Sequence, residues 1–108
     1  MPLSKRARIE IYLPSGAAYG RLQTVLEREL IFTFGGCTVI PGTKGSYLSS
    51  DQTRETESIN LIYADTPFDI SEQLAMLTRY TEMLKTAALD VTSEESILIT
   101  VYEIFHSV

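Results

Sequence analysis

The sequence predicts one α+β domain over residues 1–108, with the element order β-α-β-β-α-β. Three observations predict this order. Near the N-terminus, every second residue is apolar. Apolar residues recur at helical spacing in two later segments, and a segment near the C-terminus is almost wholly apolar or β-branched. A chain of 108 residues has the size of a single hydrophobic core, so we expect no further division.

Four segments have the pattern of β-strands. RIEIYL at 8–13 alternates, which predicts a strand with one buried face. CTVI at 37–40 is short and β-branched, and SINLIYA at 58–64 alternates again. ILITVYEIF at 97–105 has so few polar positions that we expect a strand buried on both faces.

The first predicted helix covers residues 17–34. Ser15 is the expected N-cap, and Gly35-Gly36 is the expected stop because glycine adopts the left-handed backbone conformation at low cost. Its predicted apolar stripe consists of Leu22, Val25, Leu26, Leu30 and Phe34.

The second predicted helix runs from about residue 70 to residue 88. Asp69, followed by Glu72, resembles a capping box in which Asp replaces Ser or Thr. Its predicted apolar stripe consists of Ile70, Leu74, Leu77, Leu84 and Ala88.

The segment between the two middle strands has no helical pattern and predicts the outer half of a long hairpin that turns near residues 50–53. Strand alternation then pairs Tyr47 with Glu55 and Gly45 with Glu57. Because glycine has no side chain, we expect space beside the Glu57 carboxylate.

This order of elements is the ferredoxin-like arrangement, a four-stranded antiparallel sheet with two helices on one face. We expect Ile59 and Leu61 on the covered face of the third strand. The open face is then too apolar for contact with water alone, which predicts a dimer or trimer through it, unless long loops and the N-terminal residues cover it. The predicted interface consists of Tyr12, Ile62, Leu98, Tyr102 and Ile104.

Composition argues against several functions. The net charge of −5 disfavours sequence-independent binding to nucleic acid. No apolar run is long enough for a membrane span, and no signal peptide is recognisable, so we expect a cytoplasmic protein. With Cys37 and His106 as the only residues of their kinds, we expect no disulfide, no metal site and no cofactor.

The glycine-rich segment does not match known ligand loops. Its spacing differs from that of a phosphate-binding Walker loop, and no helical pattern follows it. Gly42-Thr43-Lys44-Gly45 has the G-x-x-G form of an RNA-clamping loop, but it follows a strand instead of joining two helices. Cys37 follows a helix C-terminus, where the dipole disfavours a thiolate, so we expect a structural cysteine.

The polar hairpin is the candidate ligand site. Glu57 and Tyr47 are the pair that could bound a small polar pocket, although an ordinary polar hairpin tip is the alternative. The full predicted ligand-binding set is Tyr47, Glu57, Glu55, Arg54 and Lys44.

The segments GGCTVIPGTKGSYLSS, ETESINLIY and EESILITVYEI resemble a group of small bacterial ferredoxin-like domains of unknown function. The matching positions are Gly36, Thr38, Gly45, Tyr47, Glu57, Glu95 and Ser96. The long connection at 41–57 also gives a weaker similarity to the PII-like signalling proteins. That resemblance implies a ferredoxin-like trimer that binds a nucleotide at clefts between subunits.

The sequence therefore predicts a non-catalytic oligomer that binds a small ligand or a protein partner. The alternative is a small cofactor-free enzyme of the dimeric ferredoxin-like type, which would use a pocket with Glu57 and Tyr47. A structural partner protein without any pocket is a third possibility. The sequence predicts neither the ligand, nor a reaction, nor the number of subunits.

Overall fold

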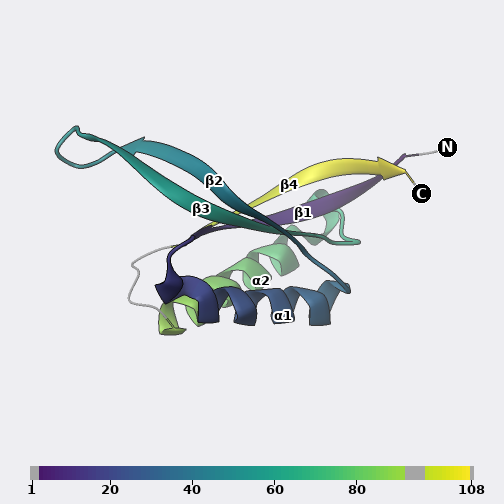
Figure 1. The fold of residues 1–108 in the computed structure, drawn as a ribbon. Coiled ribbons are helices and arrows are strands. Elements are labelled where there is room, and N and C mark those ends of the chain that lie inside the picture. The colour runs from purple at the N-terminus through teal and green to yellow at the C-terminus, as the bar shows by residue number, and fades with distance from the viewer. Residues whose placement is uncertain (1–2, 92–96, 108) are drawn as a thin grey trace.

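The structure is a computed structural model, and it describes residues 3–91 and 97–107. Its four strands form one antiparallel sheet in the order β2-β3-β1-β4, and both helices lie against one face of this sheet (Figure 1). This is the predicted ferredoxin-like fold. The elements are β1 (Leu3–Pro14), the short 3-10 helix η1 (Ala17–Tyr19), α1 (Gly20–Phe34), β2 (Thr38–Leu48), β3 (Arg54–Asp65), α2 (Ile70–Val91) and β4 (Leu98–Ser107).

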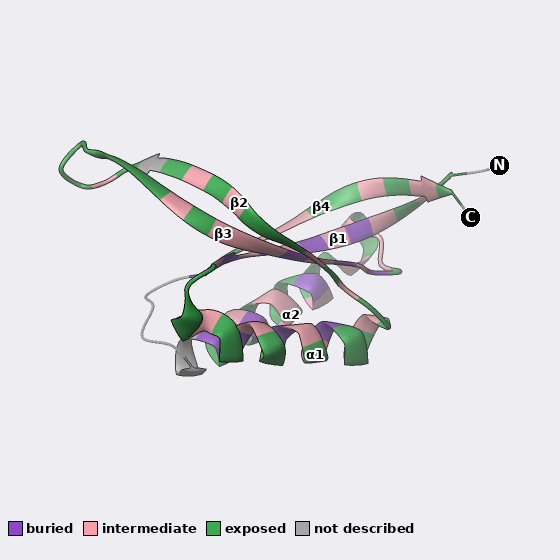
Figure 2. Ribbon diagram, viewed as in Figure 1, coloured by how far each residue is buried: buried purple, intermediate pink, exposed green. Residues whose placement is uncertain are grey.

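The hydrophobic core lies between the sheet and the helices (Figure 2). β1 is a central strand, and alternate residues along it are fully buried, which accounts for the alternation seen in the sequence. Burial of each such large side chain contributes about 1.5–3 kcal/mol. The buried apolar residues are Ala7, Ile9, Ile11 and Leu13 from β1, Leu22, Leu26 and Leu30 from α1, Ile62 and Ala64 from β3, Leu77, Leu84 and Ala88 from α2, and Ile97 just before β4.

The prediction for the faces of β3 was wrong by one residue. Ile62, which was expected on the open face, has 0% exposure and belongs to the core. Leu61, which was expected inside, lies opposite Tyr12 on the open face. Residues 61–64 are apolar on both faces, so alternation could not assign the face, and the pairing of Ile11 with Ile62 decides it.

The expected stop of α1 is confirmed, but its expected N-cap is not. Gly35 has φ 87°, and its N–H donates to the Ile31 carbonyl at 2.8 Å, as expected for a left-handed C-cap. At the other end, η1 precedes α1, and no side chain caps either element. The Ser15 N–H instead donates to the Ser58 carbonyl of β3, so Ser15 joins the start of the helical segment to the sheet.

Asp69 caps α2 as predicted, but its reciprocal partner differs. Asp69 Oδ1 accepts hydrogen bonds from the N–H groups of Ser71 and Glu72 at 2.9 and 3.3 Å. The Asp69 N–H donates to Gln73 Oε1 at 2.7 Å, so Gln73 takes the role expected of the Glu72 side chain. Gln73 has a non-helical backbone, and the next residue, Leu74, which was predicted to lie in the apolar stripe, is 59% exposed.

The β2–β3 hairpin has the predicted register, with Gly45 opposite Glu57 and Tyr47 opposite Glu55. A β-bulge interrupts the ladder between Ile40 and Thr43, where Gly42 takes φ 69°. The hairpin extends beyond the helices (Figure 1), and the molecule is 48 Å along its longest axis. Its outer half is therefore a two-stranded ribbon without a helix beneath it.

Candidate functional site

An apolar row crosses the middle of the open sheet face. Tyr12 on β1 lies between Leu61 on β3 and Leu98 on β4 in the strand register. Leu98 is 58% exposed, and Tyr102, further along β4, is also exposed. Cross-strand apolar rows of this kind stabilise a sheet best when another surface covers them.

Glu10 on β1 connects β1 to β4 beside this row. Its Oε1 accepts hydrogen bonds from the Tyr12 hydroxyl at 2.9 Å and from the Thr100 hydroxyl at 3.4 Å. Its other oxygen accepts a hydrogen bond from the Tyr102 hydroxyl. These bonds favour the neutral phenols, so the hydrogen bond to Glu10 raises the pKa of both Tyr12 and Tyr102.

Arg8 forms the second polar group of the open face. Its Nε and Nη2 atoms donate to the two carboxylate oxygens of Asp65 at 2.6 and 3.0 Å, a bidentate pair between β1 and β3. The guanidinium also stacks over the Tyr63 ring, 4.3 Å from its centre. The hydrogen bond to Asp65 raises the pKa of Arg8, which keeps this side chain charged. The central charges of the open face thus have partners within one chain.

The structure gives three outcomes for the predicted interface residues. Tyr12, Leu98 and Tyr102 lie on the open face, as their contacts and register show. Ile104 pairs with Arg6 and follows the same alternation along β4. Ile62 lies in the core and is not part of this face.

Sequence reasoning missed Leu61, Tyr63, Asp65 and the role of Arg8. If Ile62 had been assigned to the core, alternation would have placed the odd-numbered residues of β3 on the open face. Leu61, Tyr63 and Asp65 would then have been recognised as part of it.

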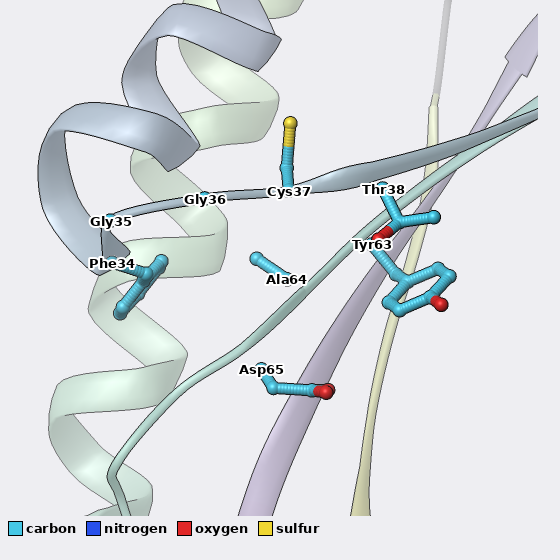
Figure 3. A pocket seen from close by; sticks show the side chains of 8 residues that line it. All are labelled: Phe34, Gly35, Gly36, Cys37, Thr38, Tyr63, Ala64 and Asp65. Atoms are coloured by element: carbon cyan, nitrogen blue, oxygen red, sulfur yellow. The ribbon is translucent and has the colours of Figure 1, made fainter.

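A shallow hollow of about 410 Å³ lies where α1 ends and β2 begins (Figure 3). Figure 3 shows that the Cys37 thiol points away from Asp65, so these two groups do not converge. Burial, and then the charge of Glu27, raises the pKa of the Cys37 thiol, which makes it a poor nucleophile at neutral pH. The hollow is lined by Phe34, Gly35, Gly36, Cys37, Thr38, Tyr63, Ala64 and Asp65.

The hairpin does not gather the predicted ligand residues into one cavity. Glu55 and Glu57 follow the alternation of Leu61 on the open face, whereas Lys44 and Arg54 follow the opposite alternation. Lys44, Arg54 and Glu55 are exposed, and Glu57 is half-buried. Tyr47 is placed by its pairing with Glu55.

The expected space beside Glu57 is already occupied. A Cβ atom built on Gly45 would lie only 2.6 Å from Ile59 Cδ1. Gly45 therefore accommodates the Ile59 side chain from the neighbouring strand, which is a packing reason for glycine at this position.

The described residues contain neither a metal-binding cluster nor a membrane-spanning helix. Within 3–91 and 97–107, no group of three or more His, Cys, Asp or Glu side chains is arranged to hold a metal ion. Over the same residues, neither helix is long and apolar enough to cross a membrane.

The open face, the hollow and the long hairpin belong to a fold that occurs in known structures. The divalent cation tolerance protein Cut A1 from Thermus thermophilus superposes with a TM-score of 0.59 at 14% identity, over 92% of this chain and 82% of that protein. CutA1 from Oryza sativa gives 0.54 at 14% identity, over 94% and 82%.

CPII from Thiomonas intermedia K12, described as a nitrogen regulatory PII-like protein bound to ADP, AMP and bicarbonate, gives a TM-score of 0.53 at 18% identity, over 98% of this chain and 97% of that one. These superpositions show that the chain shares the fold of CutA1 and PII-like proteins. No protein-family model matches the sequence, and no curated protein matches it either.

Proposed function

We propose that this protein is a non-catalytic, ligand-binding module that works as a homo-oligomer, either a dimer or a trimer, assembled through the open sheet face. The observation that carries the proposal is that the central polar side chains of that face have partners, whereas apolar side chains beside them are exposed. The polar side chains of Glu10 and Arg8 have partners within one chain, while Leu98 is left 58% exposed. The centre of this face can therefore be buried without leaving Glu10 or Arg8 unpaired.

The apolar row is a surface that a second copy of the chain can cover. Tyr12, Leu61 and Leu98 lie side by side on three strands, and removal of such surface from water contributes about 25 cal/mol per Å². A second copy fits this face because it offers the same row in return, as in a symmetric interface.

The long hairpin supports the same assembly. An isolated two-stranded ribbon is marginally stable in water, and the outer half of the β2–β3 hairpin has no helix beneath it (Figure 1). Leu48 near its tip is exposed. Contact with a neighbouring copy would cover this ribbon and fix its position.

The ligand-binding part of the proposal rests on the hairpin and the hollow. Glu57 is half-buried on the ribbon, whereas Lys44, Arg54 and Glu55 are exposed. The proposed ligand-binding residues are Lys44, Tyr47, Arg54, Glu55 and Glu57. ADP, AMP and bicarbonate are suitable first probes because the PII-like protein CPII was solved with them.

Light scattering coupled to size exclusion at micromolar concentration tests the assembly. The wild-type chain is expected to elute as a dimer or trimer, and Leu98→Glu is expected to elute as a monomer. Leu74→Glu is the matched control, because Leu74 is 59% exposed but lies on α2. A monomeric wild type, or an unchanged mass for Leu98→Glu, would refute assembly through this face.

Calorimetric titration with each of the three probes tests ligand binding. At least one probe is expected to bind, and Glu57→Gln is expected to change its affinity. Glu103→Gln on β4 removes an exposed carboxylate elsewhere and serves as the control. If no probe bound, or if Glu57→Gln left the affinity unchanged, the hairpin assignment would be wrong while the assembly stood.

A further inference from the structure

α1 presents a second surface, on the side away from the sheet. Arg21, Val25, Arg28 and Phe32 occupy positions i, i+4, i+7 and i+11 of the helix, so they share one face. We call these four residues the outer α1 face. The face lies opposite the stripe that α1 buries, which consists of Leu22, Leu26 and Leu30.

Both apolar residues of this face are exposed. Phe32 is 89% exposed, the largest value among the exposed large hydrophobic residues that the structure describes, and Val25 is also exposed. A single exposed apolar residue needs no explanation, but two in line on one helix face form a ridge that another surface can cover.

The charges of this face are positive and unpaired. Arg21 and Arg28 are exposed, and within residues 3–91 and 97–107 neither forms an ion pair or a side-chain hydrogen bond.

The acidic residues of α1 do not belong to the outer α1 face. Glu27 accepts a hydrogen bond from Gln23, and Glu29 accepts hydrogen bonds from Thr33 and Tyr80. A chain with a net charge of −5 thus carries a local positive stripe with apolar residues between its charges.

The spacing and the charge together define the occupant. Alternating steps of four and three residues are those of a coiled-coil seam, so a helix can pack along the face. The α1 helix of a second copy would bring Arg28 toward other arginines, which is unfavourable. We propose that the outer α1 face binds an acidic, amphipathic helix of a partner protein, which covers Phe32 and Val25 and pairs carboxylates with both arginines.

This surface is independent of the proposed assembly. The helices lie on one side of the sheet and the open face is on the other (Figure 1), so both surfaces can be occupied together. An anionic membrane is a poorer occupant, because only two cations lie on this face and each contributes only about 1 kcal/mol near such a surface.

Fluorescence anisotropy with a designed probe tests the proposal. The probe is a labelled acidic peptide of about three heptads, with leucines on one face flanked by glutamates, a length at which a helix can form. The control peptide has lysine in place of every glutamate. The acidic probe is expected to bind the full chain and to weaken as salt is raised, whereas the lysine peptide is expected not to bind.

Variants locate the site. Arg28→Glu is expected to weaken the acidic probe about fivefold or more, and Phe32→Ser about tenfold. Lys5→Glu, which reverses an exposed charge on β1, is expected to leave the affinity unchanged. All three side chains are exposed, so circular dichroism should show the wild-type fold in each variant.

Three outcomes would overturn the proposal. They are absence of binding to the wild type, equal binding of both peptides, and binding that survives Arg28→Glu and Phe32→Ser. Sedimentation with vesicles of phosphatidylserine and phosphatidylcholine completes the test. Binding to these vesicles without binding to the acidic probe would identify a lipid surface as the occupant and refute a partner helix.

Discussion

The Tyr102 hydroxyl on β4 donates a hydrogen bond to Glu10 on the neighbouring strand β1. Tyr12 and Thr100 donate to the same carboxylate, so one acidic side chain collects three hydroxyl groups at the centre of the open face. The hydrogen-bonding capacity of this carboxylate is therefore largely used within the chain.

Glu10→Gln is expected to lower the pKa of Tyr12 and Tyr102 toward the ordinary value. The hydrogen bond to the carboxylate is the largest cause of both raised values, and an amide cannot supply its charge. Stability is expected to fall by about 1 kcal/mol, since these are charge-assisted bonds on a partly exposed face. Absorbance titration of the phenolates measures the pKa change, with Glu103→Gln as the control.

Alkaline pH is expected to destabilise the fold through Tyr80. Burial raises the pKa of Tyr80 from 10.0 to about 12, with the charge of Glu29 as a further cause. The unfolded chain therefore releases this proton first, so the contribution of Tyr80 to stability is constant below about pH 10 and falls as the pH rises toward 12. Tyr12 and Tyr102 contribute in the same direction.

Urea unfolding at a series of pH values checks this sign. Tyr80→Phe is expected to lose less stability between pH 10 and pH 12 than the wild type does. At pH 7, the difference in stability between Tyr80→Phe and the wild type gives the cost of losing the hydrogen bond to Glu29, separately from the effect of alkaline pH. An identical alkaline slope in the variant would show that Tyr80 does not titrate as its burial requires.

Two glycines at the ends of α1 are expected to respond oppositely to alanine. Gly35 has φ 87°, so Gly35→Ala is expected to cost about 1 kcal/mol through backbone strain. Gly20 has helical angles and open space around it, so Gly20→Ala is expected to stabilise the fold by about 0.5–1 kcal/mol. Denaturant midpoints measure both changes, and equal signs would contradict the cap assignment.

The contact between Gly45 and Ile59 predicts a coupled pair. Gly45→Ala is expected to displace the Ile59 side chain and to cost up to about 1 kcal/mol, because the added Cβ would lie 2.6 Å from Cδ1. Ile59→Val removes that atom, so the double variant is expected to be more stable than the sum of the single changes. A double-mutant cycle in urea measures the coupling, and strict additivity would rule out the contact.

Local chemistry was sufficient for much of the fold. Gly35 stops α1 and Asp69 caps α2 because their own backbone and side-chain chemistry acts within one turn. The hairpin register followed from alternation about its turn, which placed Gly45 opposite Glu57 correctly. These features depend on residues close together in the chain.

The sequence by itself determined the element order and the ferredoxin-like class, since both follow from periodicity and turn residues. Only the tertiary structure decided which face of β3 enters the core. Residues 61–64 are apolar on both faces, so Ile62 is inside only because β3 pairs with β1 in one particular register. The contacts of Glu10 with Tyr102 and of Arg8 with Asp65 join residues from distant parts of the chain. No local pattern encodes these contacts, because they exist only after β1 has taken its place between β3 and β4.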